Sequence, residues 1–291
     1  MKYRVRHTTS YAYASKVDLA SHVLHLSPRR LAYQRVGAVS ITADPDPTRR
    51  SEGVDHFGNG VVRLFLDLPH RAFEVTLTAE VEVAFPAPPA PEETPPWEQV
   101  AAAAAAGGAA WRAAEFAFPS PMAPADPAAG AYAKPSFPAG RPILEGLLDL
   151  MRRINRDFAF RAGVTTINTP IAEVLERQAG VCQDFTHLMI AGLRCLGLPG
   201  RYVSGYLRTK PPPGQMPRRG ADQSHAWVGA WMGPGLGWVD LDPTNDIVVR
   251  EEPVVLAWGR DYGDISPVRG VILGGGRHSV DVGVDLEALD G

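Results

Sequence analysis

Alternating apolar and polar positions dominate the first 85 residues of the chain. Four segments show a period of two or an enrichment in β-branched side chains, which is typical of strands with one buried face. They are KYRVRHTTSYAY, GAVSITADP, GVVRLFLDLP and AFEVTLTAEVEVAF. Proline, glycine and aspartate separate them, and DHFGNG at 55–60 is a turn signal. The pattern predicts an antiparallel β domain over residues 1–85.

Alanine and proline dominate the next segment, residues 86–140. Its alanine-rich part, at about 97–116, predicts a helix that the prolines on either side end. The segment shows no pattern of catalytic residues. We interpret it as an ordered connector with mobile patches.

Helical and strand patterns then mix over residues 141–291. Apolar residues at helical spacing predict an amphipathic helix that begins near 143; they are Ile143, Leu147, Leu150, Met151 and Ile154. A second helix is predicted in TPIAEVLERQ, with Thr169 as its N-cap, Pro170 as its first residue and Gly180 after its end.

A third helix is predicted at 182–196, closed by Gly197 and Pro199. Four strands are predicted after it, with a Pro-, Gly- and Arg-rich loop, TKPPPGQMPRRGADQ, between the first two. The strands are GRYVSGYLR, SHAWVGAW, GWVDLD and HSVDVGVDL. The whole segment therefore predicts an α+β domain over residues 141–291.

Charge and composition exclude several classes of protein. The chain has 29 basic and 32 acidic residues, a net charge of -3, and no long basic stretch, so we expect no nucleic-acid partner. The N-terminal segment alternates instead of forming the apolar region of a signal peptide, and we expect neither export nor a membrane span. Two cysteines make no disulfide scaffold, which fits a reducing, cytoplasmic location.

One of the two cysteines lies in AGVCQDFTHL, where a predicted helix begins. At this position Cys182 meets unpaired N–H groups and the positive end of the helix dipole, and both favour a reactive thiolate. The same N–H groups stabilise the oxyanion that forms when a thiolate attacks a carbonyl. A free cysteine is more often a small buried apolar side chain, and Cys195 is interpreted in that way.

A nucleophilic cysteine needs a base and a group that orients the base. His225 in the strand SHAWVGAW is the favoured base, because the helix of Cys182 must pack on that sheet. His187 is nearer in sequence but points about 140° away from Cys182 around the helix, and is interpreted as structural. Asp240 and Asp242 share one face of the strand GWVDLD, and spacing alone does not choose between them.

Taken together, GVCQDFTHLMIAGLRCLGLPGRYVSGYL, SHAWV and GWVDLDPTN resemble the transglutaminase-like superfamily. Its bacterial members carry a Gly-Val-Cys-x-Asp motif, a His-Ala-Trp strand and a Trp-x-x-x-Asp-Pro-Thr strand, and this order is found here. The opening strands with their D-x-F-G-N turn resemble the N-terminal β domain of the bacterial branch. The segment GRDYGDISPVRGVILGGGRHSVDVGVDL resembles its C-terminal end.

The resemblance implies Cys182 as nucleophile, His225 as general base and acid, and Asp242 as the orienting carboxylate. It implies a papain-like or transglutaminase-like core, in which the cysteine helix packs on an antiparallel sheet beside the N-terminal β domain. Such an enzyme transfers acyl groups from peptide or isopeptide amides through a thioester, and then hydrolyses or transamidates them. No cofactor is implied, and the expected partner is a peptide or protein substrate.

Two other functions remain open at this point. The fold could serve as a catalytically silent binding scaffold, and Cys, His and Asp are also zinc ligands. No H-E-x-x-H or paired C-x-x-C motif supports a zinc hydrolase. Asp184 is interpreted as a helix-dipole partner, and Trp227, Trp231 and Trp238 either wall a cleft or pack in the core. No side-chain donor for an oxyanion hole is identified.

Overall fold

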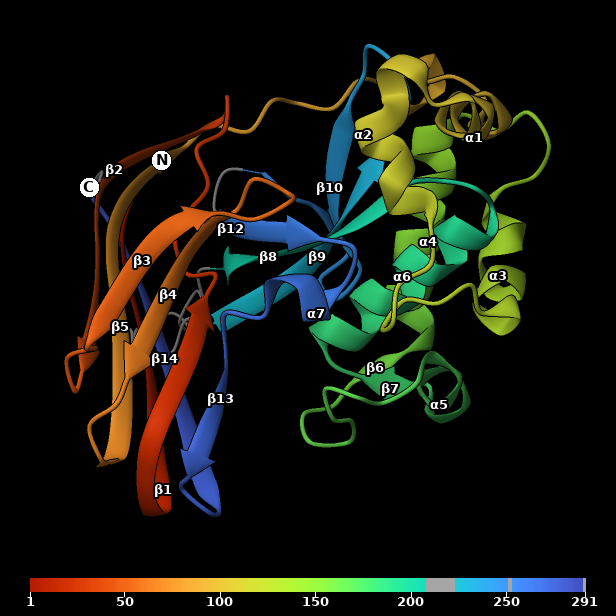
Figure 1. Ribbon diagram of the computed structural model, residues 1–291. Helices are drawn as coiled ribbons and strands as arrows, with labels where there is room; N and C mark the ends of the chain where they lie inside the picture. Colours follow the sequence, from red (N-terminus) through yellow and green to blue (C-terminus); the bar gives the residue numbers. More distant parts are fainter. Residues whose placement is uncertain (208–222, 251–252, 290–291) are drawn as a thin grey trace, which may run out of the picture.

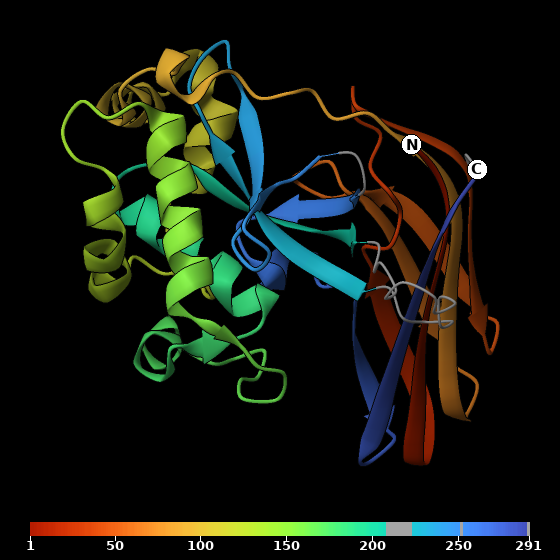
Figure 2. The same cartoon turned by 180° about the vertical axis from the view of Figure 1, so that it is seen from behind.

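The computed structural model describes residues 1–207, 223–250 and 253–289. Two antiparallel sheets and a group of helices make up the chain, as the α+β prediction requires. Figure 1 shows the larger sheet on one side, the helices on the other and the smaller sheet between them. Figure 2 shows that both termini lie beside the larger sheet.

The larger sheet has seven strands built around one long central strand. In β1 (Lys2–Leu24), the first half pairs with β5 and β14, and the second half pairs with β4 and β13. Irregular register near Val17 separates the two halves. The remaining strands are β2 (Gln34–Asp44), β3 (Arg49–Val54), β4 (Gly60–Leu66), β5 (His70–Val83), β13 (Val268–Gly274) and β14 (His278–Ala288).

The smaller sheet carries the strands on which the sequence places the base and the carboxylates. Its order is β11 (Ile247–Val248), β10 (Trp238–Asp242), β9 (Gln223–Trp231), β8 (Gly200–Leu207) and β12 (Val254–Gly259). Asp240 pairs with Gly229, and residues directly opposite in antiparallel strands point to the same face. By the period of two, His225, Asp240 and Asp242 therefore share one face of this sheet.

Seven helices lie in the described part of the chain. They are α1 (Trp97–Ala106), α2 (Trp111–Ala114), α3 (Pro127–Ala133), α4 (Ile143–Asp157), α5 (Ile171–Arg177), α6 (Cys182–Cys195) and α7 (Tyr262–Ile265). Short 3-10 turns precede or follow several of them: η1 (Pro91–Glu93), η2 (Gly108–Ala110), η3 (Glu115–Ala117) and η4 (Lys134–Ser136). A small parallel pair, β6 (Ala159–Phe160) and β7 (Ala179–Gly180), joins the loops on either side of α5.

The connector packs directly against α6, the helix that begins with Cys182. A Cβ on Gly192 would lie 2.8 Å from the Ala133 Cβ, so glycine is what lets α3 approach α6 so closely. The buried Arg194 guanidinium donates to the Phe116 and Ala123 carbonyls and to the hydroxyl of Ser120. The connector therefore holds one end of the helix that carries the candidate nucleophile.

Buried side chains fasten the two sheets to each other. The Gln34 amide donates to the Val255 carbonyl (2.7 Å) and accepts from its N–H (2.8 Å). Asn59, the last residue of the D-x-F-G-N turn, makes the same pair of bonds with the Trp258 backbone, each 2.9 Å long. Side-chain amides of the N-terminal β domain thus fix the smaller sheet by hydrogen bonds to the backbone of β12.

Several details differ from the sequence-based expectations. The last predicted strand, HSVDVGVDL, was expected in the segment 141–291 but is β14 and pairs with β1, because alternation predicts a strand without telling which sheet it joins. Pro170, not Thr169, is the N-cap of α5, and the Thr169 hydroxyl instead accepts from the Thr166 N–H. The loop TKPPPGQMPRRGADQ lies outside the described residues except for Gln223. The boundaries 1–85, 86–140 and 141–291 stay a prediction.

Candidate active site

Cys182 is the first residue of α6, as the sequence pattern predicts, and it is partly exposed. The Asp184 carboxylate fastens the start of this helix, because it accepts from the Val181 N–H (2.8 Å) and from the Thr165 hydroxyl (2.7 Å). A Cβ on Gly180 would lie 2.8 Å from an Asp184 oxygen, so only glycine fits before the helix. Burial raises the pKa of Asp184, while these two hydrogen bonds oppose the rise.

His225 and Asp242 form a buried hydrogen-bonded pair. The His225 Nε2–H donates to Asp242 Oδ2 over 2.8 Å, and both side chains are almost fully buried. Three further donors hold the carboxylate: the Asn245 side-chain amide at 2.7 Å and the backbone N–H groups of Thr244 and Asn245 at 2.9 and 3.3 Å. Asp242 is therefore fixed in orientation, and its pKa is lowered because these bonds outweigh burial.

Cys182 lies close enough to the same imidazole to contribute to its electrostatics. Since Nε2 is engaged by Asp242, Nδ1 is the ring nitrogen left for the sulfur. Burial lowers the pKa of His225, but hydrogen bonds and charge interactions with Asp242 and Cys182 outweigh it and raise the pKa to about 10. The imidazole is therefore protonated at neutral pH.

Asp240, the alternative that spacing left open, has a different partner. Its Oδ1 lies 3.7 Å from Arg201 Nη2, in a pair that is almost fully buried. Burial raises the pKa of Asp240, and the charge of Arg201 opposes the rise. The structure thus brings Cys182, His225 and Asp242 together and places Asp240 with Arg201.

Comparisons with known proteins show the family of this chain. The model of the bacterial transglutaminase-like N-terminal region matches residues 3–82, and that of the transglutaminase-like superfamily matches residues 134–243. The uncharacterized protein Rv2569c of Mycobacterium tuberculosis (strain ATCC 25618 / H37Rv) is 42% identical over 100% of this chain and 94% of its own length. The chain belongs to the transglutaminase-like superfamily.

Two further proteins are similar to this chain. The uncharacterized protein ML0607 of Mycobacterium leprae (strain TN) is 31% identical over 98% of each chain. The crystal structure of "a Putative Cysteine Protease from Cytophaga hutchinsonii" covers 100% of this chain and 91% of its own, with a TM-score of 0.77 and 23% identity. At that identity the likeness shows the fold, and the predicted transglutaminase-like fold with an N-terminal β domain is confirmed.

Stability should depend on pH through the protonated His225. Its folded-state pKa of about 10 lies above the value of ~6.5 for an unperturbed histidine. The contribution to stability is therefore complete below the unfolded value and is lost as the pH rises through about 10. Urea unfolding across this range should show a falling free energy of unfolding, and His225→Gln should flatten that fall. An equal fall in the variant would contradict the assignment.

Other residues near α6 have structural roles. His187 accepts from the Tyr262 N–H at 3.2 Å, and burial lowers its pKa to about 4. Asp261 accepts from the Gly263 N–H at the start of α7 (2.8 Å) and from the Met122 N–H (2.9 Å). Cys195 was expected to be buried but is exposed at the other end of α6, where its thiol donates to the Asp126 carbonyl.

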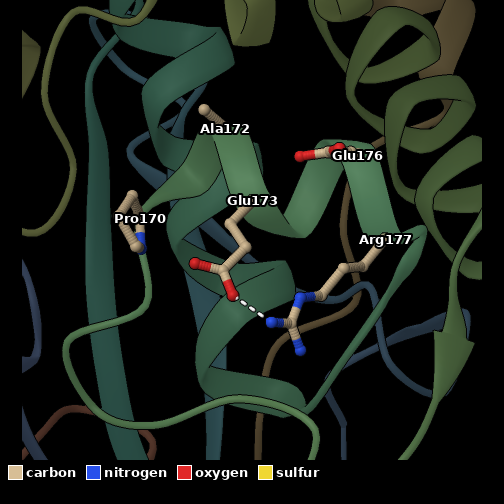
Figure 3. Close-up of a pocket in the computed structure, with 5 residues that line it drawn as sticks. All are labelled: Pro170, Ala172, Glu173, Glu176 and Arg177. Carbon is tan, nitrogen blue, oxygen red and sulfur yellow. Dashed lines mark ion pairs between the residues drawn. The ribbon is translucent and has the colours of Figure 1, made fainter.

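The three tryptophans have separate environments. Trp227 is fully buried, with its ring 6.4 Å from that of His225, and Trp231 is also buried. Trp238 lines a cavity of about 420 Å³ between the two sheets and the connector. Another hollow, drawn in Figure 3, lies along α5 and is crossed by the Glu173–Arg177 ion pair. Neither is lined by Cys182, His225 or Asp242.

Sequence reasoning missed Asn245 and Thr165. Asn245 follows the Asp-Pro-Thr motif, and its place three residues after Asp242, in a turn, was the available signal. Thr165 lies 19 residues from Asp184, so no local pattern predicts its hydrogen bond. The described residues contain no group of three or more His, Cys, Asp or Glu side chains that could hold a metal ion. Within them, no helix has the length and apolar character needed to cross a bilayer.

Proposed function

We propose that this protein is a cysteine acyl-transfer enzyme that acts on peptide or isopeptide amides through a thioester. The observation that carries the proposal is a hydrogen-bonded His-Asp pair beside a cysteine at a helix start. Cys182 begins α6 and raises the pKa of an imidazole whose Nε2 donates to Asp242 over 2.8 Å. Nucleophile, base and orienting carboxylate in that order are the parts that thiol catalysis requires.

Each residue has a definite role in the proposed reaction. The Cys182 thiolate attacks the amide carbonyl carbon, a C–S bond forms, and the carbonyl oxygen becomes an oxyanion near the unpaired N–H groups of α6. The protonated His225 gives its proton to the amide nitrogen, the C–N bond breaks, and the amine leaves. The acyl group stays on Cys182 as a thioester. Water or a second amine then attacks this thioester, His225 accepts the attacking group's proton, the C–S bond breaks and the Cys182 thiolate is restored.

Asp242 and Asn245 serve this chemistry by holding the imidazole. The buried carboxylate fixes which ring nitrogen faces the sulfur and stabilises the positive charge on the ring. The Asn245 amide holds the carboxylate at 2.7 Å and lies 3.4 Å from the same ring nitrogen of His225. In such a water-poor site, small errors of orientation have large effects on rate.

Hydrolysis and transamidation differ only in what resolves the thioester, and we propose hydrolysis. The enzyme is incubated with an N-acetylated peptide library, isotopically heavy water and a labelled primary amine. A released carboxylate that carries heavy oxygen is the expected result. Incorporation of the labelled amine without release of the acid would show that the enzyme is a transamidase and not a hydrolase.

The same incubation tests the other reading of the fold. If neither product forms, and Cys182 reacts with iodoacetamide no faster than Cys195, the protein is instead a catalytically silent binding scaffold. The proposed setting is the cytoplasm, where both free thiols stay reduced. The proposed partner is a peptide or protein that carries the amide.

A further inference from the structure

A cavity of about 420 Å³ lies where three parts of the chain meet. The N-terminal sheet contributes Arg29 and the turn at 56–58, the connector contributes Trp111 and Arg112, and the smaller sheet contributes Arg201, Trp238 and Trp258. Trp238 begins β10 and Asp242 ends it, which separates the cavity from the candidate active site by about 13 Å at ~3.3 Å per residue. The volume is within the range of small-molecule sites, about 300–1,000 Å³.

Cations and indole rings are stacked in layers on the inner side of this cavity. The Arg201 guanidinium lies 4.3 Å from the Trp238 ring and 3.8 Å from the Trp258 ring. The Arg29 guanidinium lies 3.6 Å from the same Trp258 ring. Arg112 adds a third cation at the rim, where it is exposed and lies 5.2 Å from the Trp111 ring.

Among the described side chains that line this cavity, the arginines outnumber the carboxylates. The Asp55 carboxylate, which does not line it, also interacts with Arg29. Arg29 donates to two neutral acceptors, the Asn59 side-chain oxygen and the Phe57 carbonyl. Burial, with the charge of Arg201 as the next largest cause, lowers the pKa of Arg29 to about 10. Among the described residues that line the cavity, Glu115 is the one carboxylate, and it already lies 2.8 Å from His56. Asp240 approaches Arg201 only to 3.7 Å.

Two cations on one indole ring, Arg201 buried and Arg29 partly buried, repel each other, and an anion bound beside them relieves that repulsion. The tryptophan rings that line the cavity can pack against a planar group carried by the same bound anion. We propose that this cavity binds a small aromatic carboxylate, with its anionic group toward Arg29 and Arg112, its ring against the tryptophans and Arg201 as a positive floor. The proposal does not rest on the function of Cys182.

Calorimetric titration with two matched probes tests this site on the full chain. N-acetylphenylalanine carries the carboxylate, and N-acetylphenylalaninamide is the same molecule without the charge. We expect the carboxylate to bind at least about 10-fold more tightly than the amide, with affinity that falls as salt is added. Equal binding of the two probes, or no binding of either, would overturn the proposal.

Variants of exposed arginines locate the binding without disturbing the buried stack. Arg112→Ala should weaken N-acetylphenylalanine at least about 10-fold, because it removes a charge from the rim. Arg49→Ala is the matched control, since Arg49 is also exposed and lies 5.4 Å from the ring of Phe65 on the larger sheet. It should bind as the unaltered protein does. Equal affinity of Arg112→Ala and Arg49→Ala for N-acetylphenylalanine would show that the carboxylate binds elsewhere.

Discussion

Replacing Cys182 with alanine is expected to abolish acyl transfer, lowering kcat/KM by at least about 10³-fold, because no other group supplies the nucleophile. The fold should survive. Cys182 is only partly buried at the first position of α6, and alanine is the best helix former. The free energy of unfolding should therefore change by less than ~1 kcal/mol. Product release from the N-acetylated peptide library and urea unfolding measure the two effects.

Cys195 provides a control on the same helix. It is an exposed residue at the far end of α6. The partial burial of its thiol, together with the Asp126 charge, raises the pKa of Cys195. Cys195→Ala should retain full activity. When attack on the thioester is slow, this variant should carry one trapped acyl group per enzyme molecule. Activity that survives in Cys182→Ala, or disappears in Cys195→Ala, would contradict the proposed nucleophile.

Replacing Asp242 with asparagine is expected to lower kcat by about 10²- to 10⁴-fold, the range found when the orienting carboxylate of a triad becomes an amide. The carboxylate accepts the His225 Nε2–H and is a main reason that the His225 pKa is raised to about 10. Without its charge the imidazolium is less stable, so the His225 pKa should fall toward its ordinary value. Rates across pH and the histidine NMR titration measure both changes.

Asp264 offers a matched control for this substitution. Hydrogen bonds from Arg260 outweigh burial and lower the pKa of Asp264, which lies in α7 and is paired with Arg260 instead of His225. Asp264→Asn should lose some stability but keep its activity and the His225 titration unchanged. A similar loss of activity in both variants would point to a general effect of removing a buried carboxylate.

The elements of the site could be predicted from sequence because their signals are local. The predicted helix at 182–196 is α6 (Cys182–Cys195), and three predicted strands correspond to β8, β9 and β10. Capping, helical period and strand alternation act over a few residues, so a single sequence shows them. The motifs chose Asp242 over Asp240, and in the structure it is Asp242 that bonds His225.

The rest depends on contacts between distant segments. β3, β12 and β13 were not predicted, because these short strands owe their conformation to neighbours far away in the chain. The pairing of β14 with β1 joins residues more than 260 positions apart. Arg201 and Arg29 meet at Trp258 only after both sheets are assembled, so no spacing in the sequence predicts their cavity.

The most direct test of the central claim is the alkylation rate of each cysteine. Iodoacetamide is applied from about pH 5 to about pH 9, and peptide mass spectrometry follows Cys182 and Cys195 separately, in the unaltered protein and in His225→Ala. We predict that Cys182 reacts at least about 10-fold faster than Cys195 near pH 6, and that His225→Ala removes this difference. Equal rates at the two cysteines, unaffected by the loss of His225, would contradict the account.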